Sequence, residues 1–350
     1  MSRSAATPIR TPRALRALAA LLIAACACAL ASGCGTKQDR LAAAHTKRLT
    51  LMLDFFPNAD HAAIYSAIAH GDFRAAGLEV VPEAPAEPSE PLKLLAAGRV
   101  DMAISYEPEL LLARDRGLKV VSVGALVQRP LTSIIALPGR HVRKVADLAG
   151  KRVGTAGIAY QAAELRTALT TAGVAPSRVR EVNVGFNLIP AMLSGQVDAT
   201  LGGFWNYEAI QLQLAHRRPV VIPVDQAGVP TYDELVLAVR EEQAHSDGPA
   251  LRAFLQALTR GESEVRANPA AAAALVQRAN PSLEAKLQLE SIKRTLPASV
   301  PGEAGKPYLW QAPPAWLSFA TWMYDHHLLA RDPQGGLPPF TNEFLPGQGI

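Results

Sequence analysis

The residues best suited to contact a ligand gather in one short stretch, residues 54–65. They combine a carboxylate, aromatic rings, an amide and an imidazole: Asp54, Phe55, Phe56, Asn58, His61 and Tyr65. An apolar run at 49–53 precedes them and predicts a strand, and a helix is expected from about residue 60. Ligands of open α/β sheets bind in the loops that follow the strands, so these side chains are candidate ligand contacts. His61 could equally serve the start of the helix, and Tyr65, one turn later, could equally belong to the core.

The order of elements around this stretch predicts an α/β fold. Apolar runs that read as strands alternate with helical patterns, which is typical of a parallel sheet. The strands are expected at residues 49–53, 78–82, 100–105, 120–123 and 133–137, and the helices at 60–70, 90–97 and 107–116.

An internal repeat indicates two equivalent lobes. Residues 94–105 read LLAAGRVDMAIS and residues 191–202 read AMLSGQVDATLG, so that Asp101 corresponds to Asp198 at an offset of 97. Each copy predicts a helix, a glycine that ends it, a turn with an aspartate, and a buried strand. Chance similarity between two helix-to-strand junctions is the alternative. We expect the two aspartates to occupy equivalent turns.

The remainder of the chain, from residue 241, is mostly helical and is expected to return to the first lobe. Its helices are predicted at 248–267, 269–279, 283–295 and 314–329. Lobe one then comprises residues 48–140 and 230–350, and lobe two residues 141–229. Two crossings, near 137–142 and 224–232, would form the hinge between two doubly wound lobes.

Equivalent lobes place further loops opposite residues 54–61. These loops, at 105–109, 155–160 and 203–208, contribute Tyr106, Glu107, Thr155, Trp205, Asn206, Tyr207 and Glu208 as candidate ligand contacts. Glu107 could instead be a favourable acid at a helix N-terminus. The four loops contain no lysine or arginine, so their carboxylates favour a solute with N–H donors over an anion. Flat aromatic walls suit a planar heterocycle.

The N-terminus is predicted to be an export signal, residues 1–33, followed by a tether, residues 34–47. Four arginines precede an apolar run at 17–30, which ends in Leu-Ala-Ser-Gly-Cys with Cys34 as the expected lipidated residue. A soluble secretory signal is the alternative. The chain has 35 Lys+Arg against 31 Asp+Glu; without the four leader arginines the balance is 31 to 31, which gives no indication of a nucleic-acid partner.

The stretch at 54–65 also resembles the opening of the THI5-like (NMT1-like) family. That family shares a D-[WF]-x-P-N-x-x-H-x-x-x-Y pattern, which Asp54, Pro57, Asn58, His61 and Tyr65 match, and residues 71–80 match its G-x-F-x-x-x-G-L-x-V. The resemblance implies the type II periplasmic binding protein fold. It also implies an exported, monomeric protein that binds a thiamine-pyrimidine precursor and delivers it to an ABC permease with its ATPase.

The same family contains fungal pyrimidine synthases, so an enzyme is the main alternative. The synthases rely on a cysteine-rich iron site, whereas the only cysteines here are Cys26, Cys28 and Cys34. Walker, GxGxxG and GxSxG motifs are also missing from the sequence. We therefore expect no enzyme, cofactor or metal. Binding of a flavin-like or sulfonate solute, and a degenerate cleft that serves only as a scaffold, remain open.

Overall fold

The computed structural model describes residues 46–336 and 338–348. The expected signal segment, Cys34 and nearly all of the expected tether lie outside the described residues, so what was predicted for them stays a prediction. Within the described ranges, no helix is long and apolar enough to cross a membrane.

The first lobe is built on a five-stranded sheet in the order β2-β1-β3-β10-β4. β1 runs parallel to β2 and β3, and β10 runs antiparallel to β3 and β4. β3 and β4 are buried along their whole length, as expected for strands covered on both faces. The strands are β1 (Lys47–Met52), β2 (Leu78–Glu83), β3 (Met102–Ser105), β4 (Val120–Val127) and β10 (Leu235–Arg240).

The second lobe repeats this topology in a sheet of order β7-β6-β8-β5-β9. β6 runs parallel to β7 and β8, and β5 runs antiparallel to β8 and β9. The strands are β5 (Thr132–Ala136), β6 (Arg152–Thr155), β7 (Arg180–Asn183), β8 (Ala199–Phe204) and β9 (Val220–Pro223). Both sheets therefore share one order and one set of strand directions. The α/β class and the two-lobed binding-protein architecture are confirmed.

The two aspartates of the repeat occupy equivalent turns, as predicted. The carboxylate of Asp101 accepts the backbone N–H of Thr50 in β1 at 2.8 Å, and that of Asp198 accepts the backbone N–H of Arg152 in β6 at 2.9 Å. The preceding helices end at Gly98 and Gly195, whose φ angles of +68° and +77° lie in the region that favours glycine. The internal repeat is thus a repeat of structure.

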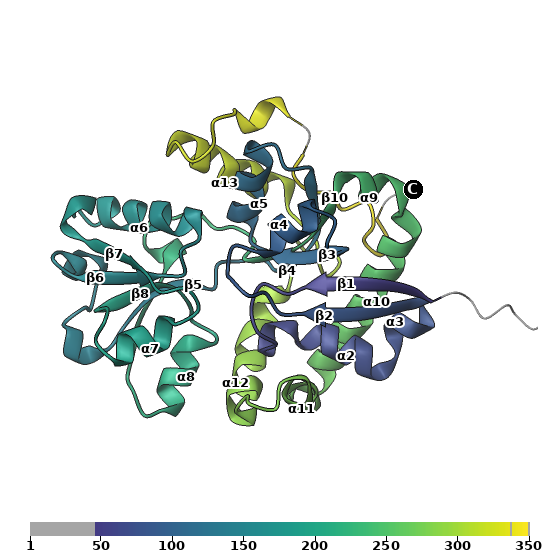
Figure 1. The fold of residues 1–350 in the computed structure, drawn as a ribbon, viewed down its shortest axis with the longest axis horizontal. Coiled ribbons are helices and arrows are strands. Elements are labelled where there is room, and N and C mark those ends of the chain that lie inside the picture. Colours follow the sequence, from purple (N-terminus) through teal and green to yellow (C-terminus); the bar gives the residue numbers. More distant parts are fainter. Residues whose placement is uncertain (1–45, 337, 349–350) are drawn as a thin grey trace, which may run out of the picture. The chain divides into compact units, whose positions relative to one another are not determined.

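The helices cover both faces of each sheet (Figure 1). α10 packs on α2, α3 and β2, α11 packs on α2, and α13 packs on α5, so the C-terminal helices cover the first lobe as expected. The helices are α2 (Ala62–His70), α3 (Asp72–Ala75), α4 (Pro91–Ala96), α5 (Glu107–Asp115), α6 (Ala159–Thr171), α7 (Leu188–Leu193), α8 (Glu208–Leu214), α9 (Glu241–Ser246), α10 (Gly248–Ala267), α11 (Pro269–Ala279), α12 (Ala285–Thr295) and α13 (Pro313–Asp325).

The first hinge crossing lies earlier than the sequence predicted. The strand expected at 133–137 was assigned to lobe one, but β5 pairs with β8 and β9 of the second sheet. The chain therefore crosses at residues 128–131 and returns between β9 and β10, at residues 224–234. The apolar sequence of a strand indicates that the strand is buried, but not which strand it pairs with. The boundary at residue 140 was misplaced for this reason.

One carboxylate ties the two crossings together. Glu234, at the start of β10, accepts the backbone N–H groups of Leu131 and Thr132 at 2.6 and 2.8 Å, and the Thr132 hydroxyl at 2.9 Å. Tyr232 donates its hydroxyl to the same side chain at 3.3 Å. Burial raises the pKa of Glu234 to about 7, and these donors oppose that shift. The two hinge crossings are therefore held together at this point.

Candidate functional site

A cleft between the two lobes is formed by the loops that follow β1, β2, β3, β6, β7 and β8. Each of the four loops expected from the sequence contributes to it. Its lining residues are Asp54, Phe55, Asn58, Asp60, Pro88, Tyr106, Ala156, Ile158, Tyr160, Gln161, Gly185, Phe186, Leu188, Gly202, Phe204, Tyr207 and Glu208. The cleft is therefore built from the carboxyl ends of strands in both sheets, where the fold places ligands.

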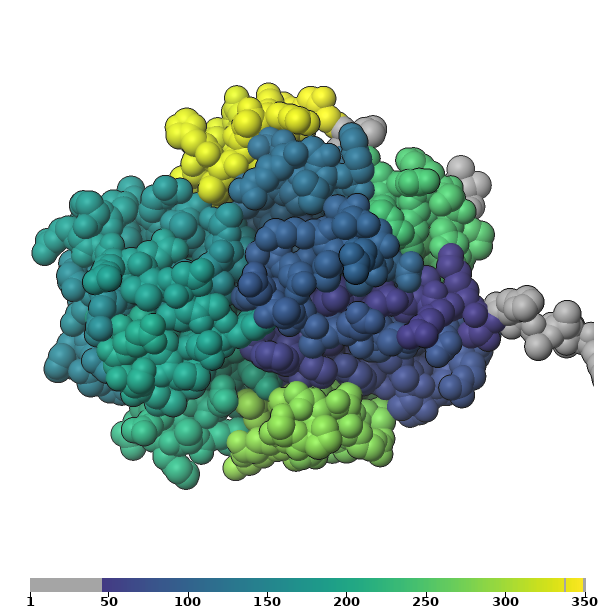
Figure 2. All heavy atoms as spheres, viewed as in Figure 1, coloured from purple at the N-terminus to yellow at the C-terminus, as the bar shows by residue number. Residues whose placement is uncertain are grey.

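The cleft is nearly shut in this structure. It encloses about 50 Å³, which is room for a few water molecules. In the space-filling view, the second lobe (teal) abuts the blue and purple parts of the first lobe (Figure 2). A solute the size of a substituted ring can therefore reach the lining residues only when the lobes part.

Asp54 lies at the centre of a buried hydrogen-bonded group. Its two carboxylate oxygens accept His61 Nε2 at 2.8 Å and the Tyr106 hydroxyl at 3.0 Å. The other ring nitrogen of His61, Nδ1, is 3.2 Å from the backbone N–H of Asn58. Because a backbone N–H can only donate, Nδ1 accepts and the proton lies on Nε2, which donates to Asp54. His61 thus orients the carboxylate from behind.

Asp60 is a second carboxylate in the cleft wall. One of its oxygens, Oδ1, accepts Asn206 Nδ2 at 2.7 Å and the Thr295 hydroxyl at 2.9 Å. Burial raises the pKa of Asp60 from its ordinary 3.8 to about 6, although His61 and these two donors oppose the shift. The side chain therefore carries its charge at neutral pH in a site that is otherwise unfavourable for it.

Glu208 provides the third carboxylate, at the start of α8. It accepts the backbone N–H of Phe204 at 2.7 Å, and burial raises its pKa to about 7 in spite of that bond. Gln161 lies nearby and accepts the backbone N–H of Ala156 at 2.8 Å. Gly202 has a φ of +108°, which residues with a side chain rarely adopt, so this position beside Gln161 favours glycine.

Aromatic rings from both lobes form the apolar part of the cleft. The rings of Phe55 and Phe186 meet edge to face with centroids 4.8 Å apart, and Phe56 lies 5.4 Å from Phe186. Tyr106 and Tyr160 face each other across the lobes at 5.9 Å. The lining thus combines flat apolar surfaces with a small number of placed polar groups, which is typical of small-molecule sites.

The charge of the cleft has one sign. Asp54, Asp60 and Glu208 line it, and no lysine or arginine is among the described residues that do so. Glu109, which receives a hydrogen bond from Ser105 at 2.8 Å, lies close behind; burial raises its pKa to about 7. An anion would find no positive partner here, whereas a donor of N–H bonds would find several acceptors.

The structure brings six of the candidate contacts into the cleft lining: Asp54, Phe55, Asn58, Tyr106, Tyr207 and Glu208. Three others lie near it without lining it. Phe56 is 46% exposed beside Phe55, His61 is fully buried behind Asp54, and Asn206 bridges Asp60 and Thr295. Asn58 also caps the short helix at Ala59–His61, through a bond from the backbone N–H of Asp60.

The remaining four candidates lie away from the lining, each with a structural role. Glu107 accepts the backbone N–H of Asp233 at 2.7 Å, and burial beside Asp233 raises its pKa well above the ordinary value. Thr155 donates to Glu181 at 3.1 Å. Trp205 donates its indole N–H to the carbonyl of Pro130 at the first hinge crossing. Tyr65 packs on the core, and burial raises its pKa to about 12.

Several lining residues were not singled out from the sequence. Asp60 and Tyr160 lie within loops already expected to face the cleft, and the acid and the ring were the available signals. Gln161 gave no comparable signal. Phe186 gave none because the strand before it, β7, is short and polar, with the sequence REVN. Its position at the end of a parallel strand became evident only from the sheet.

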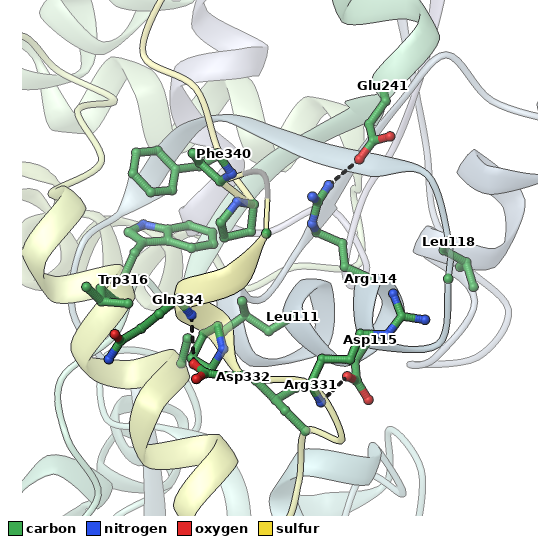
Figure 3. Close-up of a pocket in the computed structure, with 18 of the residues that line it drawn as sticks. Leu111, Arg114, Asp115, Leu118, Glu241, Trp316, Arg331, Asp332, Gln334 and Phe340 are labelled. Carbon is green, nitrogen blue, oxygen red and sulfur yellow. Dashed lines mark hydrogen bonds and ion pairs between the residues drawn. The ribbon is translucent and has the colours of Figure 1, made fainter.

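A larger hollow of about 570 Å³ lies elsewhere on the first lobe, beside α5 and α13 (Figure 3). Several of its charged groups already pair with protein atoms. Arg114 and Glu241 form an ion pair at 2.5 Å, and Asp115 accepts the backbone N–H of Arg331 at 3.1 Å. The hollow also lies away from the loops at the carboxyl ends of the strands, where the two lobes meet. The interlobe cleft, with its unbalanced carboxylates, is therefore the better candidate site.

This architecture defines a class: the chain has the fold of periplasmic binding proteins. It superposes on the alkanesulfonate-binding protein SsuA from Xanthomonas axonopodis with a TM-score of 0.63 and 17% identity, over 81% of this chain and 95% of that one. A Candida albicans protein described as having the generic periplasmic binding protein fold gives a TM-score of 0.60 and 16% identity, over 81% and 91%. At such identities the likeness concerns the fold alone.

The chain belongs to the NMT1/THI5-like family, whose model matches residues 58–272. It is 39% identical to a Haemophilus influenzae protein named for thiamine biosynthesis, over 64% of this chain and 70% of the relative. It is 38% identical to the formylaminopyrimidine-binding protein of Halalkalibacterium halodurans, over 63% and 66%. A Legionella pneumophila 4-amino-5-hydroxymethyl-2-methylpyrimidine phosphate synthase is 27% identical, over 71% and 79%.

Proposed function

We propose that this protein is an extracytoplasmic solute-binding protein that captures an aminopyrimidine thiamine precursor and delivers it to an ABC importer. The observation that carries the proposal is the cleft lined by Asp54, Asp60 and Glu208 without a lysine or arginine among its described lining residues. The relative that binds formylaminopyrimidine supports this choice of solute. An aminopyrimidine offers N–H donors to the carboxylates and a flat ring to the aromatic walls.

Capture would proceed by closure about the hinge. The two crossings at 128–131 and 224–234 join lobes that both contribute to the cleft, so rotation of one lobe traps the solute between them. Closing excludes water and strengthens the hydrogen bonds that the carboxylates accept. The closed form would then dock on the permease, whose ATPase drives release and import.

The family also supplies the alternative, a pyrimidine synthase. The Asp54–His61–Tyr106 group resembles a catalytic arrangement, but His61 is fully buried and both its ring nitrogens have partners. Gel filtration of the mature chain after incubation with an aminopyrimidine, followed by chromatography of the released ligand, tests the binding function. We expect the ligand to be retained through gel filtration and recovered unchanged. Loss of the ligand during gel filtration would contradict the binding function.

Affinity for the proposed solute should depend on pH through Glu208. Its pKa is raised to about 7, so the carboxylate that accepts an N–H bond is present above pH 7 and is lost as pH falls through that value. We expect the dissociation constant to rise about tenfold between pH 8 and pH 6. Most of this rise falls below the pKa, where the ionised fraction of a single carboxyl group drops about tenfold per pH unit. Isothermal titration calorimetry across this range measures it.

The matched control for this pH dependence is Glu208→Gln, which keeps the side-chain shape and the ligand's own titration but removes the titrating carboxyl. Its affinity should be weaker at pH 8 and should vary less with pH than that of the wild type. Equal pH profiles for the two proteins would contradict the role given to Glu208.

Lipid anchoring at Cys34 is a separate part of the proposal. Export with lipid on Cys34 would keep the binding protein beside its permease on the outer side of the cytoplasmic membrane or in the cell envelope. We expect Cys34→Ala to move the exported protein from the membrane fraction to the soluble fraction without lowering its melting temperature. A Cys34→Ala protein that stays in the membrane fraction with its leader removed would contradict the anchor.

A further inference from the structure

Hydrogen bonds cross from one lobe to the other at one end of the cleft. Asn206, in the loop after β8, donates Nδ2 to Asp60 Oδ1 at 2.7 Å and to the Thr295 hydroxyl at 2.6 Å. Asp60 and Thr295 both belong to the first lobe, whereas Asn206 belongs to the second. An amide nitrogen carries two hydrogens, so it can make both bonds at once. Asn206 is fully buried in this position.

Thr295 connects this contact to the cleft wall. It is the last residue of α12, and its hydroxyl lies 2.9 Å from Asp60 Oδ1 and 2.9 Å from the carbonyl of Ser291. The hydroxyl therefore donates to the first lobe while it accepts from the second. Thr295 does not line the cleft itself, so it reaches a solute only through Asp60.

A second contact repeats the arrangement two turns earlier on α12. Gln288 Nε2 donates to the Tyr207 hydroxyl at 3.2 Å, and Tyr207 lines the cleft from the second lobe. Residues 288 and 295 are seven apart and share one face of the helix. That face also contacts α8 of the second lobe, beside which α12 lies in Figure 1.

We propose that Thr295 and Asn206 are positioning residues that hold the Asp60 carboxylate in the cleft wall and, with Asp60, form a latch that keeps the lobes closed. Gln288 and Tyr207 extend the latch along α12. The two bonds that Asn206 donates, to Asp60 and to Thr295, depend on both lobes being in place. Opening the hinge breaks these bonds together.

The latch is reversible because closure leaves polar atoms unpaired. In the closed structure, Asn206 Oδ1 and Gln288 Oε1 are buried without a hydrogen-bond partner among the described residues. Water would satisfy both oxygens in an open form, so their burial opposes closure. The bonds to Asp60 favour closure, and the two effects leave the lobes able to part.

The consequence for a solute rests on the proposed function. If only the closed form holds the solute, the observed affinity scales with the fraction of protein that is closed. Weakening the latch should then speed release more than it slows capture, because the contacts form after the solute has reached the open cleft.

The test compares Thr295→Val, which removes the hydroxyl, with Thr295→Ser, which keeps it. Thr321→Val is the matched control, because the Thr321 hydroxyl makes the same bond within its helix, to the carbonyl of Leu317 at 2.8 Å, but faces solvent. Small-angle X-ray scattering of the mature chain without ligand measures closure. Stopped-flow release of formylaminopyrimidine measures the dissociation rate.

We expect Thr295→Val to increase the radius of gyration and to speed release about tenfold, the effect of losing hydrogen bonds to a charged group. Thr295→Ser and Thr321→Val should behave as the wild type. Asn206→Ala should open the protein similarly, and the double variant should show less than the sum of the two effects, because both act on one contact.

Two results would overturn the latch: an unliganded wild type that is already open in solution, or a folded Thr295→Val protein with unchanged scattering. If the wild type binds no aminopyrimidine, the proposed solute fails and the scattering arm still decides on the latch. If Thr295→Val does not fold, Asn206→Ala provides the same comparison from the other lobe.

Discussion

Replacing Asp54 with asparagine is expected to weaken binding of the proposed solute by about 2 kcal/mol, the loss of a hydrogen bond to a charged group. The corresponding rise in the dissociation constant is about thirtyfold. An asparagine can still accept the His61 Nε2 proton through Oδ1 and can donate to the Tyr106 hydroxyl through Nδ2. The substitution therefore removes the charge that faces the solute while it preserves the bonds that hold the loop.

Calorimetry and thermal melting of the same Asp54→Asn protein separate the two effects. The melting temperature should stay close to that of the wild type while the affinity falls. Asp101→Asn is the matched control. The Asp101 side chain accepts the backbone N–H of Thr50 in the turn before β3, and Asp101 does not line the cleft. It should lower stability without changing affinity. An Asp54→Asn protein with wild-type affinity would remove Asp54 from the binding site.

Gly261→Ala is expected to destabilise the fold by about 2 to 3 kcal/mol, the upper part of the range for overpacking a close contact. Gly261 lies on α10 where that helix crosses α2, and a Cβ there would lie 2.2 Å from the carbonyl oxygen of Ala63 and 2.9 Å from the backbone nitrogen of Ala67. Backbone atoms of a packed helix cannot move aside separately, so α2 must shift as a whole.

The sign of this effect is informative. In the interior of an exposed helix, replacing glycine with alanine stabilises by about 1 kcal/mol, so the clash must exceed that gain. Chemical denaturation measures the difference. Gly139→Ala serves as the control, because a Cβ at that position meets no atom within 4 Å, and it should be close to neutral. A Gly261→Ala protein as stable as the wild type would show that α10 and α2 are less tightly packed than the structure indicates.

The sequence predicted the architecture of the fold well, because the hydrophobic periodicity and the glycine and proline residues at the ends of elements carry that information. The repeat of Asp101 and Asp198 identified two equivalent sheets. Each aspartate lies in a helix-to-strand turn and accepts a backbone N–H of the neighbouring strand, so the residue type marks the turn. The bounds of α10 and α11 follow from proline, glycine and the helical period. The partner of β5 could not be predicted in this way, because its apolar residues suit either sheet.

The candidate site was predicted at the level of loops but not of all side chains. Glu107 was expected in the cleft, yet it turns toward Asp233, because the chain returning through the hinge brings that backbone N–H within 2.7 Å. Asn206 was expected to face a ligand, and it meets Asp60 and Thr295, which is about 90 residues further along the chain. Such orientations depend on contacts between distant segments, which spacing along one loop does not encode.

The most direct test of the central proposal is calorimetric titration of the mature chain with formylaminopyrimidine and, separately, with an alkanesulfonate. The carboxylate-lined, aromatic cleft predicts binding of one formylaminopyrimidine per chain and no measurable binding of the sulfonate, since a buried anion would lack a positive partner. Tight binding of the alkanesulfonate, with no affinity for formylaminopyrimidine, would contradict the proposed function.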